Sequence, residues 1–508
     1  MHVMTRRRRW ILPLLAAVGL GQAAPDHRLA DAAERRDLPA VRALLKQGAD
    51  VNVSQPDGAT ALHWAAHWDD LDAADALVKA RANVNAANDH GVTPLALAAE
   101  NGNVAMVEKL LGAGANPNAA VGTGEPVLMT AARAGSTHVV RALLAQGANV
   151  NAKEPTHGQT ALMWAAANGH ADVLTLLLEA GADIRARSDA RPRIVHTGNR
   201  YGDRGADKGV VRMEMGGFTP LLFAARQGDE RVAVVLLAKG ADVNDQAANG
   251  TSALVLAAHS GHSALAAMFL EKGANPNADA AGYTALHAAV LRGDLPLVRV
   301  LLGRGVDPNV RLKRGTPSRY YSKDWALNDV ALTGSTPFWQ AARYGDIPIM
   351  RALAAAGADP KFTMPDGTTS LMTAIVANSG FGTGDRRERY LGPGDIAPTL
   401  EENERLTREA AALALELGAD LHAVNTAGDT ALHLAASQAL SSVVQLLVDK
   451  GANLEAVNKR KLTPLGVALV PRPPSPLQIE GPDRRKGTAD LLRTLGAKEP
   501  DPAVVKPR

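Results

Sequence analysis

The feature that most constrains this chain is a short block, Gly-x-Thr-x-Leu, that recurs along most of its 508 residues. Uninterrupted copies are about 33 residues apart, a period typical of stacked repeat proteins. The glycines that open the clear copies are Gly58, Gly91, Gly124, Gly158, Gly217, Gly250, Gly282, Gly334, Gly367 and Gly428, and a last copy starts near Leu462. A unit this short cannot bury its apolar face alone, so neighbouring copies must stack on one another.

Each copy carries the signals of two helices. In the copy that opens at Gly158, the Thr160 hydroxyl is placed to cap a first helix, and Asn168-Gly169 ends that helix. A second helix precedes Gly181, which suits a left-handed helix end. The apolar face of this second helix is predicted to comprise Val173, Leu176 and Leu177. The chain is 46% hydrophobic but 4% aromatic, and paired alanines such as Ala65-Ala66 let neighbouring helices approach closely.

Several copies depart from this pattern. Arg81 stands where most repeats have a C-cap glycine, and Gln438-Ala439 stands where Asn-Gly ends a helix. Pro126 and Ser252 replace the capping threonine. A non-glycine residue in the left-handed region costs about 1 kcal/mol. We therefore expect locally weaker repeats at these places and an unchanged fold.

The period and the residues inside it resemble the ankyrin-repeat family. Thr93-Pro-Leu95 and Thr219-Pro-Leu221 are similar to the family's Thr-Pro-Leu-His opening, and His63, His287 and His433 supply its histidine. The phrase Gly-Ala-Asp-Val-Asn, at 48–52 and 240–244, is similar to its closing phrase. The resemblance covers roughly residues 27–497. It implies an all-α solenoid of about twelve helix-turn-helix repeats, connected by β-hairpin-like loops.

Placing the repeats on the chain gives its expected organisation. We predict a signal peptide at 1–23, an N-terminal capping repeat at 24–57, ankyrin repeats at 58–187, 217–310 and 334–461, a C-terminal capping repeat at 462–497 and a tail at 498–508. Four insertions exceed the repeat: a first at 188–216, a second at 311–333, a third at 378–402 and a fourth at 471–487. The first and second should extend loops between repeats. The third and fourth should lie between the two helices of one repeat.

The N-terminus has the order of a secretory signal. Four arginines, 6–9, precede a short apolar run at 10–20, and small residues follow before Pro25. An uncleaved anchor or a disordered basic tail is the alternative, and both the general secretory and the twin-arginine routes stay open. We expect a periplasmic or extracellular protein. Without residues 1–23 the formal charge falls from +3 to about −1, so the mature chain gives no global case for nucleic-acid binding.

The insertions differ in composition from the repeats. They contain Tyr201, Tyr320, Tyr321, Tyr390, Trp325 and Phe381, and many arginines, including Arg191, Arg193, Arg200 and Arg204. Tyrosine, tryptophan and arginine are enriched at binding hot spots. Loops that only pack on their own repeats are an equally good interpretation. The proline-rich fourth insertion is interpreted as an extended or disordered loop.

The sequence offers no catalytic or metal-binding pattern. The family uses the opening histidine to brace its turn, so the resemblance implies structural roles for His63, His287 and His433. His259 and His262 lack a third metal ligand, and no nucleophile elbow or phosphate loop is present. Trp64, Trp164 and Phe223 occupy similar places in three repeats; we interpret them as core, with a concave binding stripe as the alternative. We expect no enzyme activity and no cofactor.

These points predict a protein-binding scaffold that docks a partner on hairpin tips, first helices and insertions. The predicted tip residues are Asp57, His90, His157, Asn249 and Asp366, joined from the insertions by Tyr201, Arg204, Tyr320, Tyr321 and Trp325. We expect a monomer with a protein partner, no nucleic-acid partner and no membrane insertion of the mature chain. The alternatives are a secreted effector that acts on host proteins, and a ligand-binding protein or enzyme with a site under the insertions.

Overall fold

The computed structural model describes residues 26–197, 210–317, 327–329, 332–377, 399–470 and 484–505. These residues form 24 helices, arranged as consecutive pairs. Contacts divide the chain into two compact units: a first unit of Met1–Thr123 with Ala145–Gly147, and a second unit of Gly124–Leu144 with Ala148–Arg508. The helical repeat fold predicted from the sequence is therefore confirmed. No helix among the described residues combines the length and apolar character needed to cross a bilayer.

The first unit is built of three helix pairs. They are α1 (Arg28–Glu34), α2 (Leu38–Lys46), α3 (Ala61–His67), α4 (Leu71–Lys79), α5 (Pro94–Asn101) and α6 (Val104–Gly112). The first helices of successive pairs contact one another, α1 with α3 and α3 with α5, and the second helices do the same. Each pair thus supplies the apolar partner that its neighbour lacks.

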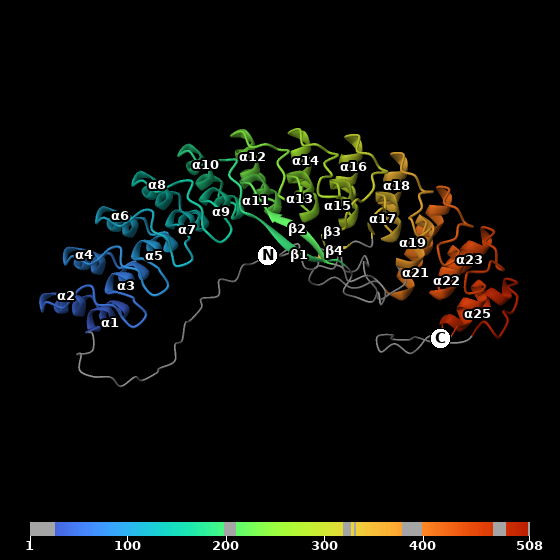
Figure 1. Cartoon of the computed structure of the whole chain (residues 1–508), viewed down its shortest axis with the longest axis horizontal. Coiled ribbons are helices and arrows are strands. Elements are labelled where there is room, and N and C mark those ends of the chain that lie inside the picture. The colour runs from blue at the N-terminus through green and yellow to red at the C-terminus, as the bar shows by residue number, and fades with distance from the viewer. Residues whose placement is uncertain are drawn as a thin grey trace. The chain divides into compact units, whose positions relative to one another are not determined.

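The second unit continues the same arrangement. Its helices are α7 (Val127–Ala134), nearly all of α8 (Thr137–Ala145), α9 (Ala161–Ala167), α10 (Ala171–Glu179), α11 (Pro220–Gln227), α12 (Glu230–Ala238), α13 (Ala253–Ser260), α14 (Ser263–Glu271), α15 (Ala285–Arg292), α16 (Leu295–Gly303), α17 (Pro337–Arg343), α18 (Ile347–Ala355), α19 (Ser370–Ala377), α21 (Leu400–Glu416), α22 (Ala431–Ser437), α23 (Ser441–Asp449), α24 (Pro464–Leu469) and α25 (Arg484–Thr494). Figure 1 shows α11, α13, α15 and α17 in one row and α12, α14, α16 and α18 in another.

Local chemistry explains where the helices begin and end. Thr160 Oγ1 accepts a hydrogen bond from the Met163 N–H at 3.4 Å, as the cap prediction requires. Ser252 caps α13 in the same way, whereas Pro126 gives α7 no side-chain cap. Arg81 and Ala439 take the left-handed conformation, with φ of 65° and 55°, as expected from their positions.

The core is made of small and medium apolar side chains. Both members of the alanine pairs Ala65-Ala66 and Ala224-Ala225 are at most 1% exposed, so first helices pack without bulk between them. In α10, Val173, Leu174 and Leu177 are buried, and each contributes roughly 1.5–3 kcal/mol. The predicted apolar face was wrong in one place, since Leu176 is only half-buried and Leu174 takes its place.

The asparagine of the closing phrase joins one repeat to the next. In the first unit, Asn85 Oδ1 accepts the Asn116 N–H at 2.7 Å and its Nδ2 donates to the Gly114 carbonyl at 3.1 Å. In the second unit, Asn244 Oδ1 accepts the Asn275 N–H at 2.7 Å, and its Nδ2 donates to the Gly273 carbonyl at 3.3 Å. Asn151 and Asn309 repeat this double contact. The phrase is therefore a clamp between repeats.

A four-stranded sheet, which the sequence analysis did not predict, connects the first and second insertions. Strands β1 (Ala190–Thr197) and β2 (Val210–Gly216) form an antiparallel hairpin, and β3 (Thr316–Pro317) pairs antiparallel with β4 (Leu327–Asp329). β4 runs parallel to β1, which gives the order β2-β1-β4-β3. In Figure 1 the sheet lies on the side of the first helices that faces away from the second helices.

The third and fourth insertions end earlier than the ranges 378–402 and 471–487 assigned to them. Helix α21 begins at Leu400, where Thr399 caps it by accepting the Glu402 N–H at 3.1 Å. Helix α25 begins at Arg484, which pairs with Glu404 at 2.5 Å. Both helices are longer than the nine-residue second helices of the other repeats, and these polar contacts lie in their first turns.

Candidate functional site

The predicted tip residues lie at the turns that open the repeats, and three of them are engaged in those turns. Asp57, Asn249 and Asp366 each accept a backbone N–H two residues further along, at 3.0, 3.1 and 2.9 Å. Isolated bridges such as Ser54↔Thr60 and Gln246↔Ser252 close these loops, so they are hairpin-like as predicted. His90 and His157 have exposed side chains.

The tips of successive repeats are connected through their backbones. The carbonyls of Asp57 and His90 accept the N–H groups of Asp89 and Gly122, both at 2.9 Å, within the first unit. Within the second unit, the His157 carbonyl accepts the Asp189 N–H, and the Asp366 carbonyl accepts the Thr426 N–H, both at 2.7 Å. These bonds fix the spacing of the side chains that the tips present.

The remaining five predicted site residues, Tyr201, Arg204, Tyr320, Tyr321 and Trp325, lie outside the described residues. Their insertions are represented by the strands that flank them. Arg191 and Arg193 on β1 are described, and the register places them opposite Met215 and Met213 of β2.

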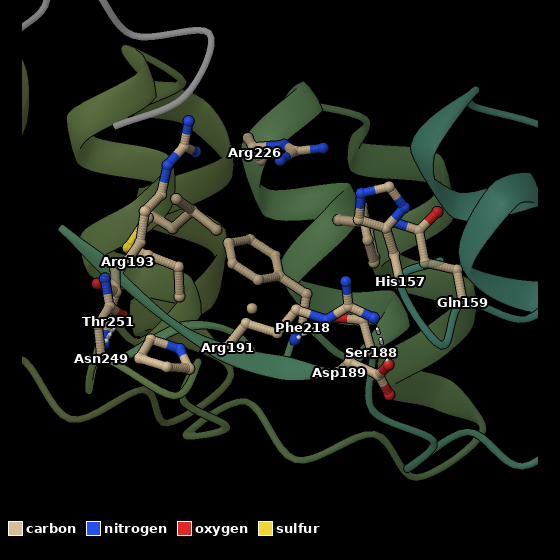
Figure 2. Close-up of a pocket in the computed structure, with 15 residues that line it drawn as sticks. His157, Gln159, Ser188, Asp189, Arg191, Arg193, Phe218, Arg226, Asn249 and Thr251 are labelled. Carbon is tan, nitrogen blue, oxygen red and sulfur yellow. Dashed lines mark hydrogen bonds and ion pairs between the residues drawn. The ribbon is translucent and has the colours of Figure 1, made fainter. Parts of the chain in front are cut away.

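The structure brings His157 and Asn249, from two tips, to one cavity of about 410 Å³. The base of the β1–β2 hairpin contributes Ser188, Asp189, Arg191 and Arg193, and the repeat between the two tips contributes Phe218, Phe223 and Arg226 (Figure 2). We call this the arginine cavity. Its lining combines residues from two tips, a first helix and the first insertion.

Arg226 is the least exposed of the three arginines that line the arginine cavity. Its Cζ lies 5.4 Å from the Phe218 ring centroid and 5.2 Å from that of Phe223, both within cation–π range. Burial lowers the pKa of Arg226 below its ordinary value, because the charged form loses solvation. Phe218 and Arg226 were missed from the sequence. Their signal is the spacing of Phe223 and Arg226, one helical turn apart at the end of α11.

Two groups of hydrogen bonds position the walls of this cavity. The carboxylate of Glu154, only 7% exposed, accepts the N–H groups of Thr156, His157 and Gln159 at 2.6–3.0 Å, which holds the tip. Ser188 exchanges two hydrogen bonds with Phe218, both at 3.0 Å, which ties the hairpin base to the residue before the N-cap of α11.

Ser188, His157 and Asp189 line the same cavity, but their geometry is not that of a catalytic triad. The Ser188 oxygen accepts the Phe218 N–H, and His157 Nδ1 faces Glu154 at 3.9 Å. Among the described residues, no hydrogen bond joins Ser188 to His157. The arrangement is suited to binding: a cationic wall, aromatic faces and amide donors.

A second cavity, of about 700 Å³, lies between the two insertions. The first insertion contributes Arg212 and Glu214 of β2, and the second contributes Lys313, Arg314 and Thr333. Asn249 borders this cavity as well. Pairing of β1 with β4 explains why segments more than 100 residues apart share its walls.

The opening histidines brace their turns as the resemblance implied. His63 Nδ1 accepts the Thr60 N–H at 3.0 Å and Nε2 donates to the Val92 carbonyl of the next repeat at 2.9 Å. His433 does the same with Thr430 and Leu462. Burial lowers the pKa of His63 and His433, and lowers that of His287 to about 4.

The aromatic residues of the first helices are neither all buried in the core nor all exposed as a concave binding stripe. Trp64 and Trp164 are half-buried, whereas Phe223 is buried. Trp64 donates from Nε1 to Gln55 at 2.6 Å and stacks on Trp68.

No group of three or more metal-ligating side chains is gathered anywhere in the described ranges.

Comparison with known proteins identifies the repeats. A model of ankyrin repeats in three copies matches residues 29–121, 106–188 and 221–311, and a single-repeat ankyrin model matches 427–459. Together these matches cover more than half of the chain. The human ASB11 ankyrin repeat domain is similar at 28% identity and a TM-score of 0.39, over 49% of this chain and 98% of that one. No curated protein matches the chain.

Proposed function

Since the chain belongs to the ankyrin-repeat family, whose repeats generally mediate contacts between proteins, we propose that it is an exported, non-enzymatic scaffold that docks a partner protein. The docking face combines the hairpin tips, the first helices and the first and second insertions of the second unit. The partner is a protein, and the scaffold acts as a monomer.

One observation carries this proposal: the arginine cavity draws on all three parts of that face at once. His157 and Asn249 come from tips, Phe223 and Arg226 from a first helix, and Arg191 from an insertion. Arginine and aromatic side chains around a partly enclosed hollow are the chemistry of interface hot spots. The described residues there offer binding groups without a paired nucleophile and base.

The docking face can be tested by blocking it, because the chain has no cysteine. A single cysteine placed by His157→Cys can be labelled with a bulky maleimide beside the cavity. Arg299→Cys, at an exposed position on α16, is the matched control on a second helix. A partner captured from an extract of the source cells, then purified, should lose binding to the labelled His157→Cys protein and keep it with the labelled control. Equal binding to both would remove the docking face from the proposal.

Export rests on the signal-like order of residues 1–23 and is tested separately. The intact mass of the protein recovered from the periplasm or medium should match a chain that begins near residue 24. A protein that keeps all four N-terminal arginines and stays in the cytosol would contradict export and leave the docking proposal intact.

A second function, binding of a small molecule, is favoured by the cavity between the insertions. Its walls come from both insertions, and Arg212, Lys313 and Arg314 give it a basic lining with Glu214 as the acid. A screen of small acids against the purified chain would support this function if Arg314→Ala abolished a hit. Absence of any hit that depends on Arg212 or Arg314 would leave protein docking alone.

A further inference from the structure

Arg226 is a half-buried cation without an acidic partner. Among the described residues it forms no ion pair, and its guanidinium lies within cation–π range of the rings of Phe218 and Phe223. Removing an arginine from water is costly unless an anion or hydrogen-bond acceptors replace the lost solvent. The two rings offset part of that cost through cation–π attraction but supply no full negative charge.

Three other arginines of the second unit have partners within the chain. Arg133 has the same place in its repeat, seven residues after the capping position, and pairs with Glu125 at 3.8 Å while lying over Trp164. Arg187 pairs with Asp245, and Arg292 donates to the His259 carbonyl at 2.8 Å. An arginine at this place in the repeat can therefore have an acidic partner, as Arg133 does.

The cavity around Arg226 has an excess of positive charge. Its lining contains three arginines, Arg191, Arg193 and Arg226, and one acid, Asp189, and Arg193 has an interaction of its own within the chain. Asp189 is already paired with Arg191, at 3.2 Å. An anion that entered the cavity would meet no uncompensated carboxylate among these walls.

Neutral donors surround the same space. The Asn249 side-chain oxygen accepts the Thr251 N–H at 3.1 Å, which leaves its NH₂ group to donate. The Gln159 amide lines the opposite side (Figure 2). Arg226 therefore supplies a charged donor and these amides supply neutral donors to one cavity, whose volume of about 410 Å³ is enough for a glutamate side chain.

We infer that the arginine cavity binds a carboxylate side chain, a glutamate or aspartate of the partner protein, which pairs with Arg226 beside the packed rings of Phe218 and Phe223. This inference rests on the proposed docking function and names the chemistry of its anchor. The methylene groups of the acidic side chain contact the aromatic rings, and the carboxylate neutralises the positive charge of Arg226.

A defined peptide tests this without any knowledge of the partner. The probe is acetyl-Leu-Glu-Leu-amide, with acetyl-Leu-Gln-Leu-amide as its neutral match, and binding to the full chain is followed by ligand-observed NMR. We expect the glutamate peptide to bind about tenfold more tightly than the glutamine peptide, and the difference to shrink as salt rises. Arg226→Met, which keeps the apolar stem, should remove the difference, and Arg226→Lys should keep much of it.

The outcomes separate the inference from the docking function. Equal binding of both peptides, or an unchanged preference in an Arg226→Met protein with an intact circular dichroism spectrum, would overturn the inference. Inorganic phosphate that binds through Arg226 while the glutamate peptide does not would overturn it too. If a captured partner binds the Arg226→Met and wild-type chains equally, docking stands and the carboxylate anchor fails.

Discussion

At the scale of single residues, the chain uses a few polar groups many times. The opening histidine is the clearest, because a neutral imidazole accepts at Nδ1 from the capping threonine and donates at Nε2 to the next repeat in His63 and His433. Protonation at Nδ1 would place its N–H against the threonine backbone N–H that it now accepts. These side chains are therefore held neutral by burial and by the bonds they make.

His287 should make the protein sensitive to acid. Its folded-state pKa of about 4 lies below its ordinary value of 6.5, so the unfolded chain takes up a proton first as pH falls. The stabilisation is complete above pH 6.5 and is lost between pH 6.5 and 4, by about 3 kcal/mol in total. His287→Gln keeps a capping side chain that does not titrate. Its melting temperature should fall less than that of wild type between pH 7 and 4.5.

The control for this experiment is His138→Gln, at an exposed position of α8. It should show the same pH dependence as wild type. An acid-induced drop in melting temperature as large in His287→Gln as in wild type would assign the sensitivity to other groups.

Arg81 offers a test of backbone strain. Its φ of 65° is a conformation that glycine adopts freely, and its side chain is exposed. Arg81→Gly should therefore slow amide exchange in α4 and α5 and stabilise that repeat by about 0.5–1 kcal/mol. Gly114→Arg, at the equivalent left-handed position of the following repeat, should act in the opposite direction. Faster exchange in Arg81→Gly would show that the arginine contributes more than strain.

At the scale of elements, the sequence predicted what is local and missed what is long-range. Thr160, Arg81 and the histidines act within one repeat or on the next, so a motif of fixed spacing reports them. The pairing of β1 with β4 joins segments more than 100 residues apart, and no short pattern encodes such a partner. The side chains of the arginine cavity meet for the same reason, since Arg191 and Arg226 are placed by different elements.

The asparagine clamp makes a prediction about neighbouring repeats. Asn244→Ala removes two hydrogen bonds, to the Asn275 N–H and the Gly273 carbonyl. Each is worth about 0.5–1.5 kcal/mol. We expect amide exchange to accelerate at 273–275 and in α14, while α24 and α25 keep their rates. Acceleration spread evenly over the second unit would contradict a local clamp.

At the scale of the whole molecule, the repeats explain both the size of the chain and why its departures from the repeat pattern lie in loops. A stacked array needs only contacts between neighbours, so long insertions in its loops are tolerated without loss of the core. The family and the fold follow from the repeated residues. The partner does not, because repeats of one family carry different surface residues and fold alone does not name function.

Docking of a partner protein through the insertions is tested most directly by a parallel capture from the source cells. One bait is the chain from residue 24 onward, and the other lacks 188–216 and 311–333, each replaced by a connection of the length found between uninterrupted repeats. Both baits should show the same helical circular dichroism per residue of repeat. We predict one protein enriched by the complete bait and absent from the other, with binding reproduced by the purified pair. Equal enrichment by both baits, or no partner protein with either, would contradict docking of a partner through the insertions.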